Sequence, residues 1–570
     1  MNNDSFLNII LDFPINESVT QRLYFRDPLN IIACKGNEDI DNCLMQLEGE
    51  QEKGNYVVGF LSYDSGLTTY LLYFGIYKAP LVVNKYQKKH KHAKTSQWKL
   101  SQSLNEFIES INTIKNHIRN GDCYQVNYTL RAKSQLIEGD IEGLYHQLID
   151  CQGAKYSAFI EHSDFSILSF SPELFFTWSN QYIETKPMKG THPLISQYSL
   201  QEQIQSLQQS KKDQSENVMI VDLLRNDLSK ICETGSVKTN KLFEVETYQD
   251  ILQMTSTIQG TLQENKRFRD IVYALFPCGS ITGAPKAKVM EIISNLENEP
   301  RGPYCGAIGY LAPNQQGLFN VAIRTIYHNK YDNSLTYGVG SGITWDSEAT
   351  NEYKEINNKI HFLHQEPPYS LFETVNLIHG KCVFWDYHFE RLKKSANELN
   401  FFPPNQTHYL SINELYEQTK LGSYRARFIY HKNGIARWEI YELPVTPITP
   451  KVQLASSPIS SNDFRIRHKT TDRSVYDELF TQNKDVFFDL ILWNERGEIT
   501  EFTKGNIVLE IDGQLLTPSS ESGLLPGILR QVLLENSLIK EKILFKEDLL
   551  VAKKIWFINS LRGWIDLDLA

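Results

Sequence analysis

The sequence predicts an α+β protein with at least two domains. At 570 residues the chain is longer than a single hydrophobic core usually serves. Helical and strand-like patterns are mixed in both halves rather than alternating regularly, which favours α+β over a doubly wound parallel sheet. A proline pair in "HQEPPYS" precedes an abrupt restart of strand-like alternation, which indicates a domain boundary near residue 367.

Composition excludes several classes of protein. The formal net charge of −10 argues against nucleic acid as a general partner. No run of about 18 apolar residues occurs, and the N-terminus lacks the basic start and the cleavage site of a signal peptide. Eight cysteines are scattered without a CxxC pair, which fits a reducing compartment. We therefore expect a cytoplasmic protein that binds neither nucleic acid nor membrane.

The basic stretch "KYQKKHKHAKTSQWK" (Lys85–Lys99) is polar and poor in aliphatic residues. Charge runs of this kind are usually solvated, so we predict a linker. We expect residues 1–100 to form an N-terminal part, residues 101–364 a catalytic domain, and residues 368–570 a separate domain. In the last of these, "LFETVNLIHGKCVFW" alternates like a strand and turns at His-Gly, and "DYHFERLKKSANEL" has apolar residues at helical spacing.

Two acidic clusters lie on predicted helices of the first half. Asp213 and Glu216 are three apart at the start of an apolar helix, and Glu352 and Glu355 are three apart with Lys359 four residues later. Each spacing puts the two carboxylates on one helix face. Such faces most often point into water. If the two helices instead face each other across a cleft, their oxygens suit Mg²⁺, which takes few protein ligands.

A series of motifs in the first half resembles the chorismate-binding enzymes. This family includes component I of anthranilate synthase and of aminodeoxychorismate synthase, and the isochorismate and salicylate synthases. The resemblance covers about residues 105–362 and implies a β-sandwich with surrounding helices. It is carried, in order, by "GDCYQVNYTLR", "SPELFF", "KPMKGTHP", "ENVMIVDLLRNDL", "FPCGSITGAPKAKVMEII", "RGPYCGAIGY" and "YKEINNK".

Two positions distinguish the members of this family. Members that add water have a lysine where this sequence has Gln125, and an amide cannot deprotonate water. The resemblance therefore implies an enzyme that uses ammonia. Among ammonia users, anthranilate synthases have alanine where this chain has Lys189, and aminodeoxychorismate synthases have lysine. Lys189 thus resembles the nucleophile that adds to C2 of chorismate while the C4 hydroxyl leaves, before ammonia attacks C4.

The same resemblance implies roles for further residues. Glu173 matches the general acid that protonates the leaving hydroxyl, so we expect burial to raise its pKa. Glu216 and Glu355 match the Mg²⁺ ligands, with Asp213 and Glu352 in support. Gln253 stands where many relatives have a histidine, and it cannot carry a proton. The expected substrate-binding residues of this half are Gln125, Thr191, Thr282, Tyr304, Arg324, Gly340 and Lys359, with Gly342 in the same glycine-rich strand.

No glutaminase signature is present in the sequence. Cysteine never occurs in a Gly-x-Cys-x-Gly elbow, and Cys305 belongs to the chorismate motif "PYCGA". We therefore expect ammonia to come from a separate glutaminase subunit or from solution.

The second half resembles the fold-type IV pyridoxal phosphate enzymes, which include class IV aminotransferases and aminodeoxychorismate lyase. The resemblance is carried by "HFERL", "RHKTTDR", "GEITEFTKGNI" and "SGLLPGILR". It implies that Lys469 holds pyridoxal phosphate covalently, that Glu501 keeps the pyridine nitrogen protonated, and that Arg391 binds the phosphate with the backbone N–H groups of Ile528 and Leu529. Many relatives have threonine where Leu529 stands. In "WFINSLRGW", Asn559, Ser560 and Arg562 match pocket residues, and Arg562 is a candidate carboxylate ligand.

Together the two halves predict a fusion that makes 4-aminobenzoate for folate synthesis. The first half would form 4-amino-4-deoxychorismate from chorismate, and the second would eliminate pyruvate from it. Two alternatives stay open: an anthranilate synthase component I fused to an ordinary aminotransferase, and a synthase with an inactive C-terminal binding domain. Fold-type IV enzymes commonly pair through their active sites, so a homodimer is expected.

Overall fold

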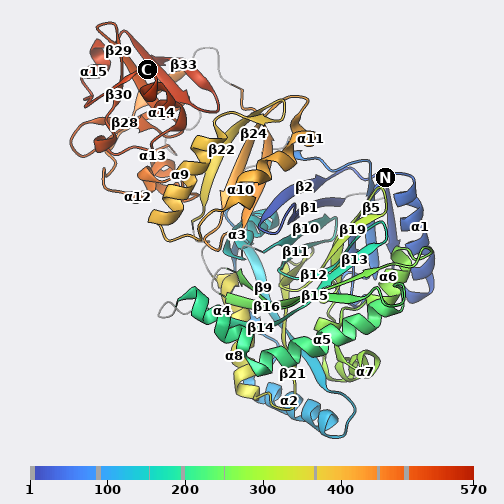
Figure 1. Cartoon of the computed structure of the whole chain (residues 1–570). Coiled ribbons are helices and arrows are strands. Elements are labelled where there is room, and N and C mark those ends of the chain that lie inside the picture. Colours follow the sequence, from blue (N-terminus) through green and yellow to red (C-terminus); the bar gives the residue numbers. More distant parts are fainter. Residues whose placement is uncertain are drawn as a thin grey trace. The chain divides into compact units, whose positions relative to one another are not determined.

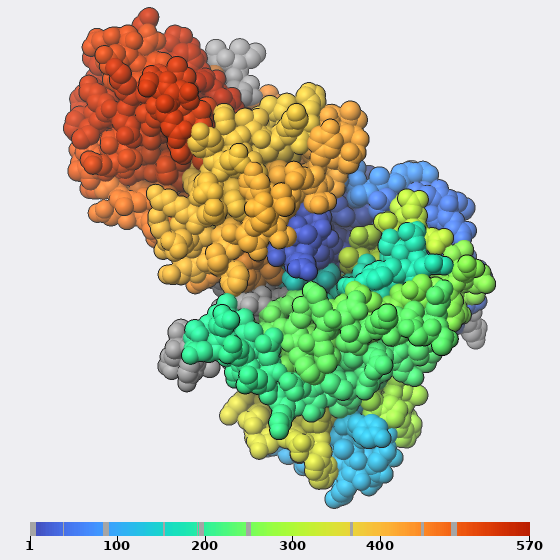
Figure 2. All heavy atoms as spheres, viewed as in Figure 1, coloured from blue at the N-terminus to red at the C-terminus, as the bar shows by residue number. Residues whose placement is uncertain are grey.

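A computed structural model of the chain describes residues 7–84, 91–152, 154–193, 199–248, 251–364, 369–445, 450–480 and 487–570. The chain divides into two compact units. Unit 1 comprises residues 1–14, 21–81 and 87–368, and unit 2 comprises residues 15–20, 82–86 and 369–570. Most of residues 1–100 therefore belong to the same unit as residues 101–364. Helices and strands are mixed in both units (Figure 1), and side chains fill the spaces between the ribbons (Figure 2).

Unit 1 contains two large sheets. The first has the strand order β17 (Gly283–Ala284), β9 (Gln125–Glu138), β21 (Ser334–Ile343), β20 (Thr325–Asn329), β11 (Phe165–Ser171), β10 (Tyr156–His162), β1 (Leu7–Pro14) and β2 (Val19–Phe25). The second has the order β14 (Met188–Pro193), β16 (Ile251–Thr261), β13 (Tyr182–Lys186), β12 (Leu174–Ser179), β19 (Gln316–Val321), β18 (Ala307–Ala312), β4 (Tyr56–Leu61), β5 (Leu72–Tyr77) and β3 (Asn30–Cys34), and β15 (Lys238–Tyr248) also pairs with β16.

The two sheets pack face to face as a β-sandwich. Their shared core draws Ile9 and Leu11 from β1 and Ile160 from β10 in one sheet, and Phe60 from β4 and Ile308 from β18 in the other. Alternate residues of each strand point to opposite faces, so the other faces of both sheets are apolar as well and need a cover.

Helices provide that cover. The outer face of the first sheet packs against α2 (Leu104–Arg119), α3 (Ile141–Gln152), α7 (Lys286–Leu296) and α8 (Ala349–His361). The outer face of the second packs against α1 (Ile40–Glu52), α5 (Lys211–Ser229) and α6 (Phe268–Leu275). The short helix α4 (Leu200–Gln209) lies against β15 and β16. The expected β-sandwich with surrounding helices is confirmed.

The linker prediction is wrong for residues 91–99, whereas residues 85–90 lie outside the described residues. Two short strands, β7 (Lys94–Thr95) and β8 (Lys99–Leu100), pair with β9. Ala93 and Trp98 are buried between the lysines. The basic side chains therefore belong to a segment whose backbone pairs with the first sheet and whose apolar residues are buried.

Unit 2 contains two groups of paired strands. The first runs β25 (Ala436–Glu442), β24 (Ser423–Tyr430), β22 (Leu371–Ile378) and β23 (Lys381–Cys382), with β6 (Val83–Asn84) parallel to β25. The second runs β28 (Ile499–Phe502), β27 (Asp489–Trp493), β26 (Lys451–Leu454), β33 (Gly563–Leu569), β32 (Lys554–Asn559), β29 (Asn506–Ile511), β30 (Gln514–Pro518) and β31 (Lys540–Lys542).

Short helices connect and cover the sheets of unit 2. The longest, α9 (Trp385–Glu398), packs Trp385, Phe389 and Leu392 onto the first sheet. The others are α10 (Gln406–Leu410), α11 (Tyr416–Thr419), α12 (Phe464–Arg467), α13 (Ser474–Phe480), α14 (Ile528–Glu535) and α15 (Asp548–Val551). Across the described parts of the chain, no helix combines the length and the apolar character that a membrane crossing requires.

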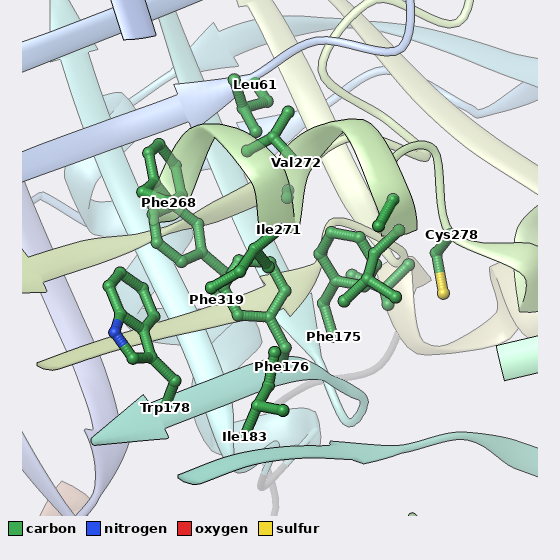
Figure 3. Close-up of a cluster of buried hydrophobic side chains, with 14 of the residues drawn as sticks. Leu61, Phe175, Phe176, Trp178, Ile183, Phe268, Ile271, Val272, Cys278 and Phe319 are labelled. Atoms are coloured by element: carbon green, nitrogen blue, oxygen red, sulfur yellow. The ribbon is translucent and has the colours of Figure 1, made fainter. Parts of the chain in front are cut away.

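The core beneath α6 is built from stacked aromatic rings (Figure 3). Phe319 of β19 lies at its centre, with its ring centroid 5.2 Å from that of Phe176 and 5.3 Å from that of Phe268. Trp178 stacks on the other side of Phe268, at 5.9 Å. Because these rings join α6 to two strands, the cluster holds a helix to the second sheet.

Replacing Phe319 by alanine should destabilise unit 1. The ring is fully buried, and its removal leaves a cavity among rigid neighbours, so the expected loss is about 3–5 kcal/mol. Thermal unfolding followed by circular dichroism would show a lower midpoint. The matched control is Ile137→Ala, since Ile137 is 63% exposed and its loss should barely move the midpoint. Equal effects of both changes would contradict this view of the core.

Candidate active sites

A cavity of about 340 Å³ opens in unit 1. Strands β9, β14, β16 and β21 and helices α5 and α8 contribute its lining. Strand β14 pairs with β16, and α5 lies against both of these strands. Helix α8 lies against β21, which also lines the cavity, so the two acidic helices border the same space. The possibility that these helices face a cleft, left open by the sequence, is the one realised.

Lys189 extends from β14 into this cavity. Its side chain is only 14% exposed, and its Nζ lies 3.8 Å from Glu216 Oε2. A Cβ at Gly342 would lie 2.5 Å from both Lys189 Nζ and Gln125 Nε2, so the bare glycine makes room for both nitrogens. Gln125 is fully buried beside Lys189 rather than in the cavity lining. Neither polar atom of its side chain has a hydrogen-bond partner within the described residues.

Four carboxylates line the cavity around this amine. Asp213 and Glu216 come from α5, and Glu352 and Glu355 come from α8. Burial raises the pKa of Glu216; the charge of Lys189 opposes the rise, and the charges of Asp213 and Glu352 add to it. The structure therefore holds like charges close enough to repel each other, at a place where few water molecules can screen them.

These carboxylates form a donor set that fits a divalent cation. Within the described residues, no three His, Cys, Asp or Glu side chains converge into a preassembled metal site. The four carboxylates nevertheless share one cavity, and the repulsion felt by Glu216 is of the kind that a bound cation removes. Oxygen donors with room left for water and substrate suit Mg²⁺.

The α8 side of the cavity also carries a cation. Lys359 Nζ lies 2.6 Å from Glu355 Oε1 and donates a 2.9 Å hydrogen bond to the Gly340 carbonyl. Burial disfavours the charged form of Glu355, but the Lys359 ammonium outweighs it and lowers the pKa of that carboxyl. Lys359 is thus held at the wall formed by β21, with its charge still in the cavity.

Glu173 lies between β11 and β12 on the opposite wall. Burial raises the pKa of this carboxyl to about 7, against hydrogen bonds from Ser280 and the Met188 N–H and the charge of Lys189. The rise agrees with the expectation from sequence. Its Oε1 has no hydrogen-bond partner within the described residues. A large fraction of Glu173 is therefore protonated near neutral pH, and its Oε1 is available to a ligand.

Other predicted substrate residues are only partly gathered here. Tyr304, Arg324 and Gln253 line the cavity, and Arg324 has a φ of 51°, a backbone conformation that is uncommon for a residue other than glycine. Thr282 is buried outside the lining, with its hydroxyl donating to the Cys278 carbonyl at 3.0 Å. The backbone of Thr191 lies in β14, but its side chain lies outside the described residues.

A second cavity, of about 350 Å³, opens in unit 2 and contains Lys469. The backbone around this lysine is held to β22, since its carbonyl accepts the Phe372 N–H at 3.0 Å. The Lys469 ammonium lies 4.8 Å from the centroid of the Phe372 ring. Burial and the charge of Arg391 lower the pKa of Lys469 to about 7. A large fraction of these amines is therefore neutral at physiological pH.

Glu501 lines the same cavity from β28. Its Oε1 accepts the Tyr476 hydroxyl at 2.9 Å, and its Oε2 accepts the Leu525 N–H at 3.2 Å. Burial raises the pKa of Glu501 to about 8 despite these bonds and the nearby Lys469 charge. Its carboxyl thus carries a proton that could be shared with a buried nitrogen base.

Arg391 lies near the N-terminus of α14. Its guanidinium donates to Glu373 Oε1 at 2.9 Å and to the Pro526 carbonyl at 3.0 Å. Gly527 caps α14 without a side-chain acceptor, so the first N–H groups of the helix, including those of Ile528 and Leu529, stay available for an anion. The Leu529 side chain packs into an apolar cluster instead of lining the cavity.

Three further arginines line the second cavity and were not singled out in the sequence. They are Arg425, Arg427 and Arg473. The first two are two apart in "SYRARFIY", so alternation along β24 puts both on one face, and this spacing is the signal that could have found them. In the first cavity His192 and Lys212 were missed in the same way; His192 Nε2 lies 3.2 Å from Asp213 Oδ2.

Comparison with known proteins agrees with this geometry. Residues 74–365 match the family described as chorismate binding enzyme. The chain belongs to the chorismate-binding enzyme family. Residues 370–568 match the family described as amino-transferase class IV. These two matches confirm both the N-terminal and the C-terminal resemblance. The chorismate-binding family usually uses Mg²⁺, and the class IV family usually uses pyridoxal phosphate.

Named relatives cover the chorismate-binding half. An aminodeoxychorismate synthase component 1 from Klebsiella aerogenes is 39% identical over 275 residues, which are 48% of this chain and 60% of that protein. One from Bacillus subtilis (strain 168) is 37% identical over 254 residues, 44% of this chain and 53% of that protein. The chain thus spans little more than half the length of these curated relatives.

A solved structure shares the fold of this half. Anthranilate synthase component I from Streptococcus pneumoniae TIGR4 superposes with a TM-score of 0.52 at 24% identity, covering 63% of this chain and 92% of that one. For this half, the family is assigned from sequence, and the fold is supported by both sequence and structure.

The residues of the second cavity fit pyridoxal phosphate. Lys469 is a buried amine with a lowered pKa, Glu501 is a buried acid, and Arg391 meets the free N–H groups of α14 at an anion site. An amine, a proton-bearing carboxyl and a phosphate cradle are the three features that this cofactor needs.

The buried pair of Glu373 and Arg391 should support the stability of unit 2. Burial disfavours the charged form of Glu373, but the Arg391 guanidinium outweighs it and lowers the pKa to about 2 from 4.5. The stabilising effect is therefore fully present above about pH 4.5 and is lost as the pH falls toward 2.

Glu373→Gln should cost about 3–5 kcal/mol at pH 7, because it leaves a buried guanidinium without its counter-charge. Urea unfolding at pH 7 and at pH 3.5 would check this, with a smaller difference from wild type expected at the lower pH. Glu390→Gln, on the helix α9 that carries Arg391, is the control, since Glu390 is 70% exposed. A deficit that is independent of pH would show that the carboxylate charge is not its source.

Proposed function

We propose that this chain makes 4-aminobenzoate from chorismate in two steps, as part of folate synthesis. Unit 1 aminates chorismate to 4-amino-4-deoxychorismate with Mg²⁺ and ammonia. Unit 2 then eliminates pyruvate from this product with pyridoxal phosphate. The homologues at 37–39% identity named aminodeoxychorismate synthase component 1 support the first step, and the class IV family match supports the second.

One observation carries the proposal. The amine of Lys189 lies in a buried cavity with four carboxylates and with Glu173, whose pKa is raised to about 7, and an amide rather than an amine stands beside it at Gln125. A water-adding enzyme needs a base at the position of Gln125, and an anthranilate synthase has no amine at the position of Lys189. The combination favours amination at the para position.

The chain's own residues can perform the first step. Unprotonated Lys189 Nζ forms a bond to C2 of chorismate, both ring double bonds shift by one position toward C4, and the C4–O bond breaks. Glu173 gives its proton to the departing oxygen, which leaves as water. Ammonia then bonds to C4, the double bonds shift back, and the C2–N bond to Lys189 breaks. Protonation of Glu173 near neutral pH, with Oε1 unpaired, supports this role.

Binding groups of both charges line the same cavity. Glu216, Glu352, Glu355 and Asp213 would hold Mg²⁺, which when bound supplies positive charge for the ring carboxylate of chorismate. Tyr304, Arg324 and Lys359 line the cavity and suit the enolpyruvyl carboxylate. Two anchored carboxylates would fix the ring so that C2 and C4 meet Lys189 and Glu173.

In unit 2, pyridoxal phosphate supplies an electron sink when bound. Arg391 and the N–H groups at the start of α14 would bind its phosphate, and Glu501 would share its proton with the pyridine nitrogen. Lys469, whose amine lies in the same cavity and has a lowered pKa, would take the proton from C4. The C3–O bond then breaks, enolpyruvate leaves and is protonated to pyruvate, and the ring becomes aromatic.

Partners follow from the same proposal. The relatives are named component 1, which supports a separate glutaminase as the source of ammonia. We propose a cytoplasmic enzyme, and a homodimer through unit 2 as in other fold-type IV enzymes.

The decisive experiment incubates the full chain with chorismate, Mg²⁺, ammonium and pyridoxal phosphate, and identifies products by chromatography and mass spectrometry. Wild type should yield 4-aminobenzoate and pyruvate. Lys469→Ala should accumulate 4-amino-4-deoxychorismate, since only the second step loses its base. Lys189→Ala should lose more than about 100-fold in amination while still binding chorismate, because nucleophilic attack is lost but the anchors remain.

Formation of 2-aminobenzoate in place of the 4-isomer would reject the proposal in favour of an anthranilate synthase. Accumulation of 4-amino-4-deoxychorismate by wild type with excess cofactor would reject the second step alone. Equal loss of binding and amination in Lys189→Ala would mean that the lysine is structural.

Amination should depend on pH through Glu173. Because the carboxyl must carry a proton and its pKa is raised to about 7, kcat should fall as the pH rises through that value. The measurement keeps the concentration of free ammonia constant across pH 6–9. Glu173→Gln should lower kcat by about 10²–10⁴-fold and remove the fall of kcat above pH 7. If kcat of the variant still falls in that pH range, another group supplies the proton.

A further inference from the structure

The second cavity contains more positive charge than its proposed cofactor accounts for. Arg391 and the start of α14 suffice for a phosphate, yet Arg425, Arg427 and Arg562 also line the cavity. The three arginines come from β24 and from the loop between β32 and β33. Their presence raises the question of which negative group they meet.

Arg425 and Arg427 have different surroundings although they share one face of β24. Arg427 has a counter-charge, since its Nη1 lies 3.8 Å from Glu439 Oε2. Its guanidinium also lies 4.8 Å from the centroid of the Phe372 ring. Arg427 is therefore compensated by the protein itself.

Arg425 has no such ion pair. Within the described residues no carboxylate lies at salt-bridge distance from it, and its Nε is buried without a hydrogen-bond partner. The guanidinium stacks on Tyr441, 4.6 Å from the ring centroid. Burial and the like charges of Arg427 and Arg562 lower the pKa of Arg425, and the charge of Glu439 opposes them only in part. Since a guanidinium stays charged at any ordinary pH, the protein holds a cation whose charge is only partly balanced.

Arg562 is brought to the same end of the cavity. Asn376 pairs directly with Arg425 across β22 and β24, and its Nδ2 donates to the Leu561 carbonyl at 3.2 Å. The residue next to Leu561 is Arg562, whose charge acts on Arg425. The loop that carries Arg562 is thus held beside the strand position of Arg425.

This end of the cavity is distant from the reactive amine. Lys469 is held at Phe372, and Arg425 lies opposite Asn376, four residues further along β22. Four residues of a strand span roughly 13 Å. A ligand whose amine reaches Lys469 can therefore meet Arg425 only with a group at its other end.

We propose that Arg425, together with Arg562, binds a carboxylate on the side of the substrate opposite to its reacting amine. The group that fits is a planar carboxylate, which a guanidinium fork can hold with two hydrogen bonds. This inference rests on the proposed function: in 4-amino-4-deoxychorismate the ring carboxylate lies across the ring from the amine. Arg425 would then select a cyclic amino acid of that shape over ordinary α-amino acids, whose carboxylate adjoins the amine.

Product binding tests the ring carboxylate directly, because 4-aminobenzoate keeps it and aniline lacks it. The full chain, loaded with pyridoxal phosphate, is titrated with each compound by calorimetry. Wild type should prefer 4-aminobenzoate by at least tenfold. Arg425→Met should reduce this preference to within about twofold, and Arg425→Lys should restore part of it, because the charge returns without the fork.

Kinetics with 4-amino-4-deoxychorismate give an independent readout. Arg425→Met should raise KM about 10- to 100-fold, with a smaller change in kcat, as expected for a lost charge-assisted bond. Arg496→Met is the control, since this half-exposed arginine pairs with Glu498 and does not line the cavity. Thermal midpoints and the absorbance of bound cofactor establish that each variant is folded and loaded.

The outcomes separate the inference from the function. If wild type converts 4-amino-4-deoxychorismate and Arg425→Met keeps its KM and its preference for 4-aminobenzoate, the inference fails and the function stands. A raised KM with an unchanged preference for 4-aminobenzoate over aniline would indicate that Arg425 binds the enolpyruvyl carboxylate instead. That result would overturn the assignment to the ring carboxylate. If wild type shows no conversion, the function of unit 2 fails, while a lost preference in Arg425→Met still supports the carboxylate site.

Discussion

The contact between Lys189 and Glu216 is the constraint around which the first site is built. Their atoms lie 3.8 Å apart in a cavity that other carboxylates also line, so Lys189 provides part of the positive charge that makes their burial tolerable. A cation bound by the same carboxylates would take over that role and leave the amine free to react. Gly342 matters for the same reason, since a side chain there would occupy the position of the amine.

The two cavities contain an excess of charge of opposite sign. The first gathers carboxylates around one amine, and the second gathers guanidinium groups around another. Like charges in a site of low dielectric need counter-charges, and the described side chains supply only some of them. A cation suits the first cavity and anionic ligands suit the second. The charge balance of each site therefore defines the class of group it takes before any reaction is considered.

The ordered motifs predicted the sandwich through the family that they resemble, and helical spacing predicted the acidic helix faces, because motifs and spacing are local signals. They failed where the answer depended on long-range packing. Residues 91–99 read as a polar linker, yet Ala93 and Trp98 are buried and the backbone pairs with β9. The role of Arg425 was equally invisible, since only the fold shows that Arg427 has a carboxylate partner and Arg425 does not.

The charge of unit 2 also bears on whether it is a catalyst or a packing module. Leu529 stands where many relatives have a threonine, so one possible side-chain contact to a phosphate is missing in this chain. In the structure this side chain faces an apolar cluster, and the N–H groups of α14 remain available to an anion. A module that only packed would gain nothing from burying Lys469 and an unpaired Arg425, because each costs free energy unless a ligand compensates it. That the chain keeps these costly buried groups favours a site that binds a ligand.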